Sequence, residues 1–324
     1  MSTNPPTYAD QQAWKDIQAF LPPRLHFTPE HSPVEEWWSH RGHDLHLDRW
    51  RNPSARTRVI LHHGVGTNGR QMSMLLGVPL HAAGFDVVAI DMPGYGCTRV
   101  APASKAYPYD EWVQIGSDFV DREAEGDARP VVLYGLSAGG MLTYHIAARN
   151  RKVKGIIGMT FLDLRLRQVA DETSHDIVAS RAGLPLAKLA SATGLHWLRI
   201  PMSLASKMSA LVNDDKALKI FLKDKSSAGS SATTRFLATY SSYEPALEPE
   251  EFDVCPILLT QPAEDRWTPE HLSNLILDRV KKVPVTKVTL ANAGHYPLED
   301  PGLQEMADAI IKFLRSLEPS AEKL

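Results

Sequence analysis

One serine of this sequence lies in a pattern that is typical of catalytic nucleophiles. Residues 135–139 read Gly-Leu-Ser-Ala-Gly, with Ser137 at the centre. An apolar run ends at Tyr134 and a helical pattern begins at Ala138, so the serine is expected on a sharp turn between a strand and a helix. The small flanking residues allow such a turn, and the start of the helix favours negative charge nearby. A glycine-rich packing turn is the alternative, but this setting favours a nucleophile.

A nucleophilic serine needs a base to accept its proton, and His295 has the best position for that role. It follows the last predicted strand, 285–291, and precedes the last predicted helix, 303–317. The C-terminal ends of parallel strands meet at one edge of a sheet. We therefore expect His295 at the same edge as Ser137.

The base in turn needs a carboxylate that fixes its tautomer. Asp265 follows the predicted strand 256–260, which places it at the same edge. Two other acids compete with it. Glu264 is adjacent but is expected to point away when Asp265 points inward, and Asp163 follows the predicted strand 153–162. We favour Asp265 and keep Asp163 as the alternative.

Acyl transfer also needs hydrogen-bond donors for a developing oxyanion. The segment His62-His63-Gly64-Val65-Gly66 follows the first predicted parallel strand, and its glycines allow backbone N–H groups to turn toward the site. The amides of Val65 and Ala138 are the expected donors, the latter directly after the nucleophile. A glycine turn without a catalytic role is the alternative.

The elements that position these residues alternate between strands and helices. Apolar runs predict strands at 58–62, 85–90, 130–134, 153–162, 256–260 and 285–291. Helical patterns are found at 72–84, 112–124, 138–150, 269–283 and 303–317, the fourth with Thr268 as its predicted N-cap. This alternation predicts an α/β fold with a mostly parallel twisted sheet and helices on both faces.

An antiparallel hairpin is predicted at 34–50, at the edge of the sheet. It contains His40, His43 and His46, whose spacing resembles a metal cluster. Because residues three apart face opposite sides of a strand, solvated histidines are favoured over a metal site. Residues 1–30 form an N-terminal extension.

Residues 164–254 interrupt the alternation, because they read as helices only. An all-helical insertion after the sixth strand is expected to form a cap, or lid, over the edge that carries Ser137. The core domain then consists of residues 31–163 and 255–324. Apolar cap residues either line a substrate pocket or bury the cap against the core; the candidates are Trp197, Met202, Met208, Leu211 and Phe221.

These motifs, in the order serine, aspartate, histidine, resemble the α/β-hydrolase superfamily between about residues 34 and 317. Asp91-Met92-Pro93-Gly94-Tyr95-Gly96 looks like the Asp-x-x-Gly-x-Gly loop of that superfamily. The resemblance is to capped serine esterases and to lysophospholipase- or monoacylglycerol-lipase-like members. It implies the α/β-hydrolase fold, a nucleophile elbow and an oxyanion hole. Pro262 departs from the usual glycine of the acid loop.

The nucleophile is a serine, which argues against the epoxide hydrolases and dehalogenases of that superfamily, whose nucleophile is an aspartate. Tyr240 and Tyr243 are therefore interpreted as packing residues and not as an epoxide-opening pair.

Composition excludes several other classes of protein. The net charge of −3 over 324 residues argues against nucleic-acid binding, and the sequence contains no apolar stretch of the length that spans a membrane. The only two cysteines, Cys97 and Cys255, are expected to be buried free thiols. A soluble, cytoplasmic protein is expected.

The sequence therefore predicts a serine hydrolase that cleaves small-molecule carboxylic esters through an acyl-enzyme, with no metal or organic cofactor. Thioesters, lactones, amides and carbon–carbon bonds of diketones remain open, because the same triad serves them. A non-catalytic binding protein with this fold is the alternative from another class.

Overall fold

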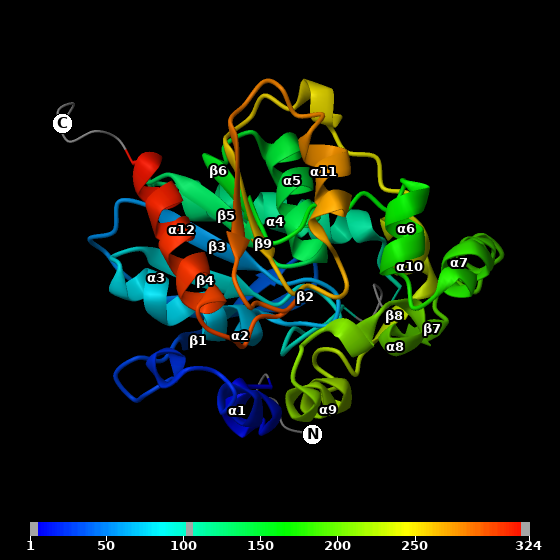
Figure 1. Ribbon diagram of the computed structural model, residues 1–324, viewed down its shortest axis with the longest axis horizontal. Helices are drawn as coiled ribbons and strands as arrows, with labels where there is room; N and C mark the ends of the chain where they lie inside the picture. The colour runs from blue at the N-terminus through cyan, green and yellow to red at the C-terminus, as the bar shows by residue number, and fades with distance from the viewer. Residues whose placement is uncertain (1–5, 102–105, 319–324) are drawn as a thin grey trace.

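The computed structural model describes residues 6–101 and 106–318. Its centre is an eight-stranded sheet with the strand order β1-β2-β4-β3-β5-β6-β9-β10 (Figure 1). The strands are β1 (Val34–His40), β2 (His43–Trp50), β3 (Arg58–His62), β4 (Asp86–Ile90), β5 (Val131–Gly135), β6 (Gly155–Gly158), β9 (Ile257–Pro262) and β10 (Val285–Leu290). β2 runs antiparallel to β1 and β4, and the strands from β3 onward pair in parallel. The predicted mostly parallel sheet is confirmed.

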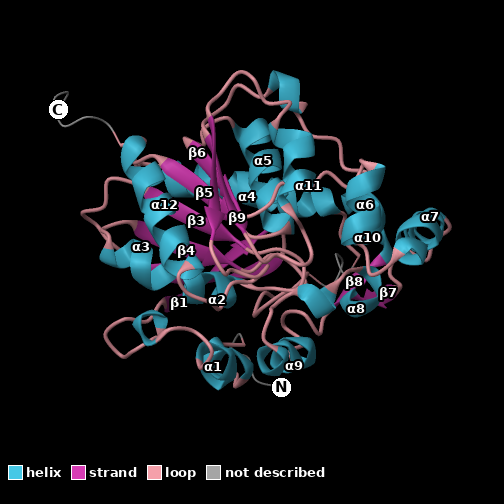
Figure 2. Ribbon diagram, in the orientation of Figure 1, coloured by secondary structure: helices cyan, strands magenta, loops and turns pink. Residues whose placement is uncertain are grey.

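Helices cover both faces of this sheet (Figure 2). One face is covered by α4 (Tyr109–Ala124) and α5 (Ala138–Asn150), which pack against each other. The other carries α2 (Gly69–Met72), the π-helical η3 (Ser73–Gly77), α3 (Val78–Ala82) and α12 (Gly302–Ser316). The strands between them are buried throughout, as in β3, β4 and β5, which explains their continuous apolar runs.

Most predicted elements have the predicted type, and some bounds differ. β3 and α5 match residue for residue, whereas β6 is shorter than the predicted strand 153–162. α11 (Glu270–Leu277) ends before the predicted Val283. Its N-cap is Pro269, so the prediction of Thr268 as the cap is wrong. The Thr268 hydroxyl donates instead to Asp265, 2.7 Å away.

The predicted edge hairpin is confirmed as β1 and β2, but the prediction that its histidines are solvated is wrong for two of them. His43 and His46 are fully buried, because β2 is covered on both sides. The three histidines contact three different acids: His40 lies 2.7 Å from Asp118, His43 3.4 Å from Glu111 and His46 2.8 Å from Glu35. They do not converge on one point.

The extension before β1 contains η1 (Tyr8–Asp10), α1 (Ala13–Gln18) and η2 (Pro23–Leu25). Ile17, Leu21 and Leu25 belong to the main hydrophobic core, and α1 lies beside α9 in Figure 1. The extension is therefore an integral part of the fold.

The segment 164–254, called the cap segment below, connects β6 to β9 on the side where the parallel strands end (Figure 1). It contains α6 (Arg167–Thr173), the π-helical η5 (Ala179–Gly183), α7 (Leu184–Ala192), β7 (Arg199–Pro201), α8 (Met202–Ala205), η6 (Met208–Ala210), α9 (Asp215–Lys223), β8 (Ser231–Thr233), α10 (Thr234–Tyr240) and η7 (Pro249–Glu251). The prediction of helices only is wrong, because β7 and β8 form an antiparallel pair. Strands of three residues are too short to show a period-two pattern.

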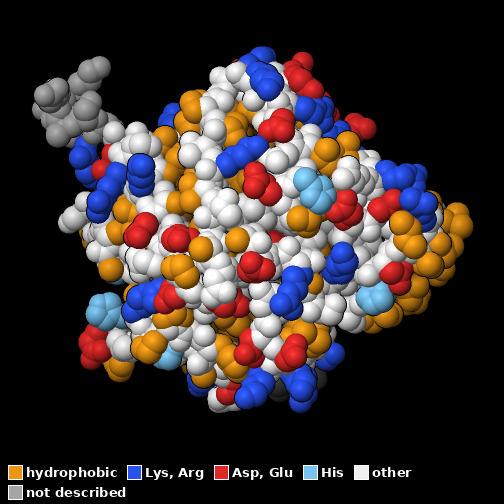
Figure 3. Space-filling model, viewed as in Figure 1, with side chains coloured by type: hydrophobic (Ala, Val, Ile, Leu, Met, Phe, Trp, Pro, Cys, Tyr) orange, Lys and Arg blue, Asp and Glu red, His pale blue; other side chains and the backbone are white. Residues whose placement is uncertain are grey.

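Figure 3 shows hydrophobic side chains gathered on the outer surface of the cap segment around α7. The large hydrophobic residues of this segment that are at least two-fifths exposed are Ile177, Val178, Leu186, Leu189, Leu195, Trp197, Leu198 and Leu204. No helix in the described ranges is both long enough and apolar enough to cross a bilayer. Cys97 and Cys255 are free and buried, as predicted.

A buried network of charges joins the N-terminal extension to the sheet. The Tyr8 hydroxyl donates to both carboxylate oxygens of Asp91, at 3.0 and 2.9 Å. His46 lies between Asp91, at 3.2 Å, and Glu35, at 2.8 Å. Burial alone would lower the pKa of His46. Hydrogen bonds and charges from the neighbouring carboxylates outweigh this effect and raise the pKa to about 9. His46 is therefore a buried cation at neutral pH.

Because the pKa of His46 is raised from 6.5 to about 9 on folding, its protonation stabilises the protein fully below pH 6.5. That contribution, about 3 kcal/mol, is lost as the pH rises through 9. His46→Gln should therefore lower the free energy of unfolding in urea at pH 6 by clearly more than at pH 9.5. The exposed His271, replaced in the same way, serves as control. If His46→Gln lowers the free energy of unfolding by the same amount at pH 6 and at pH 9.5, His46 is not the buried cation described here.

Candidate active site

Ser137 occupies a strained turn between β5 and α5. Its φ is 56° and its ψ −126°, a backbone conformation that non-glycine residues rarely adopt. Hydrogen bonds from Gly139 N to Leu136 O and from Gly140 N to Ser137 O, both 2.8 Å, close the turn. The side chain is thereby lifted above the end of the sheet.

Glycines make this turn possible because backbone segments approach one another closely there. A Cβ on Gly135 would lie 2.0 Å from the carbonyl oxygen of Gly139, and one on Gly140 would lie 1.9 Å from that of Thr160. A Cβ on Gly139 would lie 2.7 Å from His62 O, on the neighbouring strand. Each of these contacts is with backbone that has no room to move. The Gly-x-Ser-x-Gly pattern is therefore explained by packing as well as by chemistry.

His295 and Asp265 form a buried pair in the loops that follow β10 and β9. His295 Nδ1 lies 2.9 Å from Asp265 Oδ2, and both side chains are 1% exposed. Burial alone would raise the pKa of Asp265. The charge and hydrogen bond of His295 and two hydrogen bonds from Thr268 outweigh this effect and lower the pKa to about 2. Asp265 is therefore ionised at neutral pH and can hold the Nδ1–H tautomer of His295.

Two neighbours that were not predicted for this role fix the pair. Asp265 Oδ1 accepts hydrogen bonds from the amides of Trp267 and Thr268, both at 2.8 Å. The Trp267 ring packs against His295 with centroids 4.6 Å apart. His295 Nε2 is buried, and none of the described residues is hydrogen-bonded to it. This nitrogen is thus able to accept a proton.

Neither of the two rival acids lies at His295. Asp163 is paired with Arg165, whose Nη2 lies 2.7 Å from Oδ2 of Asp163. Glu264 is exposed and lines a surface hollow with Asn213 and Glu299. The geometry therefore brings Asp265 to His295, and it places neither Asp163 nor Glu264 there.

The loop after β3 passes directly beside the candidate nucleophile. A Cβ on Gly64 would lie 2.9 Å from Ser137 Cβ and 3.0 Å from Ala138 N. His63 supports this loop: Met92 N donates to its Nε2 at 2.9 Å, so its Nδ1 is the donor to Gly64 O at 2.8 Å. Val65 follows immediately in the same loop.

A cavity opens beside Ser137. Its lining is mostly apolar and combines sheet-edge loops with the cap segment: Val65, Ser137, Ala138, Leu162, Leu164, Thr173, Ser174, Leu184, Met202, Ala205, Ser206, Leu237, Tyr240 and Trp267. Both predicted oxyanion-hole residues are in this lining, as is Met202.

The other predicted pocket residues lie elsewhere. Met208, Leu211 and Phe221 are buried in the core, and Phe221 packs on Tyr296 with ring centroids 5.1 Å apart. Trp197 is 59% exposed and lines a different hollow. Tyr240, which was predicted to be a packing residue, lies in the cavity wall and also packs on Tyr109.

Among the described residues, one group has the residue types and spacing of a metal site: Glu35, His46 and Asp48, with ligand atoms within 4.8 Å of one another. Arg70 already lies 2.6 Å from Asp48 and 3.5 Å from Glu35, and His46 carries a proton. Two cations thus balance these carboxylates, so we interpret the group as a network of ion pairs.

Comparison with known proteins agrees with this architecture. A model described as "Alpha/beta hydrolase family" matches residues 59–309, and the chain belongs to that family. The structure has the α/β-hydrolase fold. No curated protein matches the chain.

Several solved structures share the fold. The monoglyceride lipase from Saccharomyces cerevisiae, solved as a soluble variant with a substrate analogue, has a TM-score of 0.72 at 16% identity, over 93% of this chain and 99% of that chain. The monoacylglycerol lipase of Paleococcus ferrophilus has a TM-score of 0.65 at 22% identity, over 84% and 99%. Est1E from Butyrivibrio proteoclasticus has a TM-score of 0.55 at 15% identity, over 87% and 98%.

Replacement of the acid tests the assignment of Asp265. Asp265→Asn should lower kcat for an ester by about 10⁴-fold, because the amide no longer stabilises the Nδ1–H tautomer. Asp163→Asn should leave kcat within a few-fold of the parent and affect mainly stability, through Arg165. Both are measured by steady-state hydrolysis with folded protein. If Asp163→Asn instead lowers kcat far more than Asp265→Asn does, Asp163 is the acid that pairs with His295 in catalysis.

Proposed function

We propose that this protein is a serine hydrolase that cleaves carboxylic esters through an acyl-enzyme on Ser137. The observation that supports this most is the setting of Ser137, on a strained turn that opens into a mostly apolar cavity. The ionised Asp265 and the buried His295 supply the remaining groups of the triad.

In the proposed mechanism, His295 Nε2 takes the proton of Ser137 Oγ as the oxygen attacks the ester carbonyl carbon. The amides of Val65 and Ala138 stabilise the resulting oxyanion, aided by the N-terminus of α5. The carbonyl re-forms, and the alcohol leaves with the proton from His295. Water then attacks the acyl-enzyme with the same base, which releases the acid and restores the Ser137 hydroxyl.

The cap segment is proposed to act as a lid that confines the substrate. It contributes Leu164, Leu184, Met202, Leu237 and other residues to the cavity wall. Because the wall is mostly apolar, the proposed substrate has an apolar acyl group, and we propose that it is of small or medium size. The free thiols of Cys97 and Cys255 support a reducing compartment, and we place the protein in the cytoplasm.

A series of p-nitrophenyl esters from acetate to palmitate tests this proposal. We expect turnover with an optimum at short or medium chain length, and a loss of about 10⁴-fold or more in kcat for Ser137→Ala. Ser117→Ala, a buried serine of α4, is the matched control and should retain full activity. Full activity in folded Ser137→Ala, or no turnover of any ester by the parent protein, would overturn the proposal.

A further inference from the structure

A second hollow lies directly beside the cavity of Ser137. The two spaces share part of their walls, since Leu164 and Leu184 line both of them. The remaining wall is formed by α6, η5, the start of α7 and the turn after α10. Leu164 and Leu184 thus form a boundary that the cavity and this hollow have in common.

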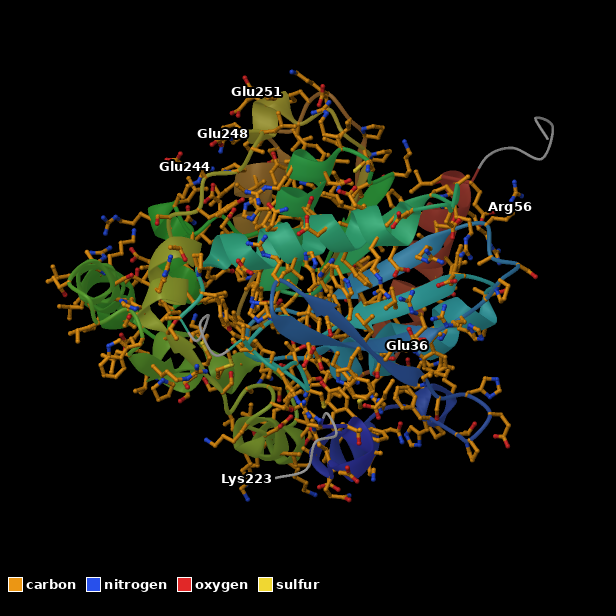
Figure 4. All side chains as sticks on the ribbon, turned by 180° about the vertical axis from the view of Figure 1, so that it is seen from behind. Glu36, Arg56, Lys223, Glu244, Glu248 and Glu251 are labelled. Carbon is orange, nitrogen blue, oxygen red and sulfur yellow. The ribbon has the colours of Figure 1, made fainter. Side chains whose placement is uncertain are left out.

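The hollow is basic, in contrast to the mostly apolar cavity. Its lining contains Arg165, Arg167, Arg181 and Lys188, and one acidic residue, Glu244. Figure 4 shows Glu244 at the surface on this side of the molecule. An anion is attracted only by those cations of the wall that no nearby carboxylate already neutralises.

Two of these cations are neutralised by carboxylates and two are not. Arg165 lies 2.7 Å from Asp163 and 2.6 Å from Glu248, and Arg181 lies 2.9 Å from Asp171. These pairs hold the two guanidinium groups in place.

Arg167 and Lys188 form no hydrogen bond or ion pair with another described residue, although the charge of Arg167 helps to lower the pKa of Asp171. Both side chains are exposed. Their charges are therefore the ones available to a ligand.

We propose that this basic hollow binds an anionic group at the non-reacting end of the substrate, so that the preferred esters carry a carboxylate or phosphate. The inference rests on the proposed function of Ser137. The ester carbonyl lies at Ser137, the apolar middle of the substrate follows Leu164 and Leu184, and its anionic end reaches Arg167 and Lys188. An acidic end group is then a requirement for full activity and not only a tolerated substituent.

Matched ester pairs test this directly. Mono-p-nitrophenyl esters of dicarboxylic acids from succinate to sebacate are compared with their methyl half-esters, which have nearly the same length but no charge. We expect kcat/KM for the acid to exceed that for the methyl ester by about tenfold at one or more chain lengths, mainly through KM. The advantage should shrink from 20 mM to 500 mM NaCl.

The double variant Arg167→Gln/Lys188→Gln assigns that advantage to the hollow. It should bring the ratio of kcat/KM for the acid to kcat/KM for the methyl ester close to one, while turnover of the methyl esters stays unchanged. Lys219→Gln, on an exposed position of α9 outside the hollow, is the control and should keep the ratio. Competition by inorganic phosphate, with a larger effect on the acid than on the methyl ester, would show that the group recognised is the anion itself.

The outcomes separate this inference from the proposed function. If the methyl esters are hydrolysed and the acid-to-methyl ratio of kcat/KM is near one at every chain length, the anionic subsite is wrong and the proposed esterase activity is unaffected. A raised ratio that survives in the double variant would overturn the assignment to the hollow. No turnover of either ester of any pair would overturn both.

Discussion

The strained backbone of Ser137 is the constraint on which the rest of the site depends. A φ of 56° at a non-glycine residue is maintained only when the surroundings over-determine it. Here the carbonyl groups of His62, Gly139 and Thr160 leave no room for a Cβ at three glycines of the turn. Two of these carbonyls come from segments that flank β5: His62 is the last residue of β3, and Thr160 follows the end of β6. The central strands and the segments that follow them thus hold the turn at Ser137 in its strained conformation.

A second constraint operates behind the loop that contains Val65, where buried charges hold the backbone in place. Asp91 accepts hydrogen bonds from Gly69 N at 2.6 Å and from Tyr8, and it lies beside the cationic His46. Gly69 begins the helix that follows the loop of Val65, so this network joins the N-terminal extension to the loop. Burial of so many charges is favourable only when all are paired, which makes the network a specific connection between distant segments.

Sequence reasoning identified what depends on local pattern and missed what depends on tertiary packing. The strand–turn–helix setting of Ser137 and the loop positions of Asp265 and His295 were predictable, because sheet topology brings such loops to one edge. The sequence favoured Asp265 but left Asp163 open as the alternative. Only the tertiary structure shows that Asp265 lies beside His295 and that Asp163 is paired with Arg165. Thr268 has a favourable N-cap sequence, but its hydroxyl is used by Asp265. The burial of His43 and His46 follows from covering layers that a strand pattern does not show.

The central claim is that Ser137 is a nucleophile activated by its surroundings. Its most direct test is treatment of the intact protein with a fluorophosphonate, followed by mass spectrometry of the digested chain. The account predicts stoichiometric labelling at Ser137 and at no other serine. An unmodified Ser137 in folded protein, or equal labelling of several serines, would contradict it.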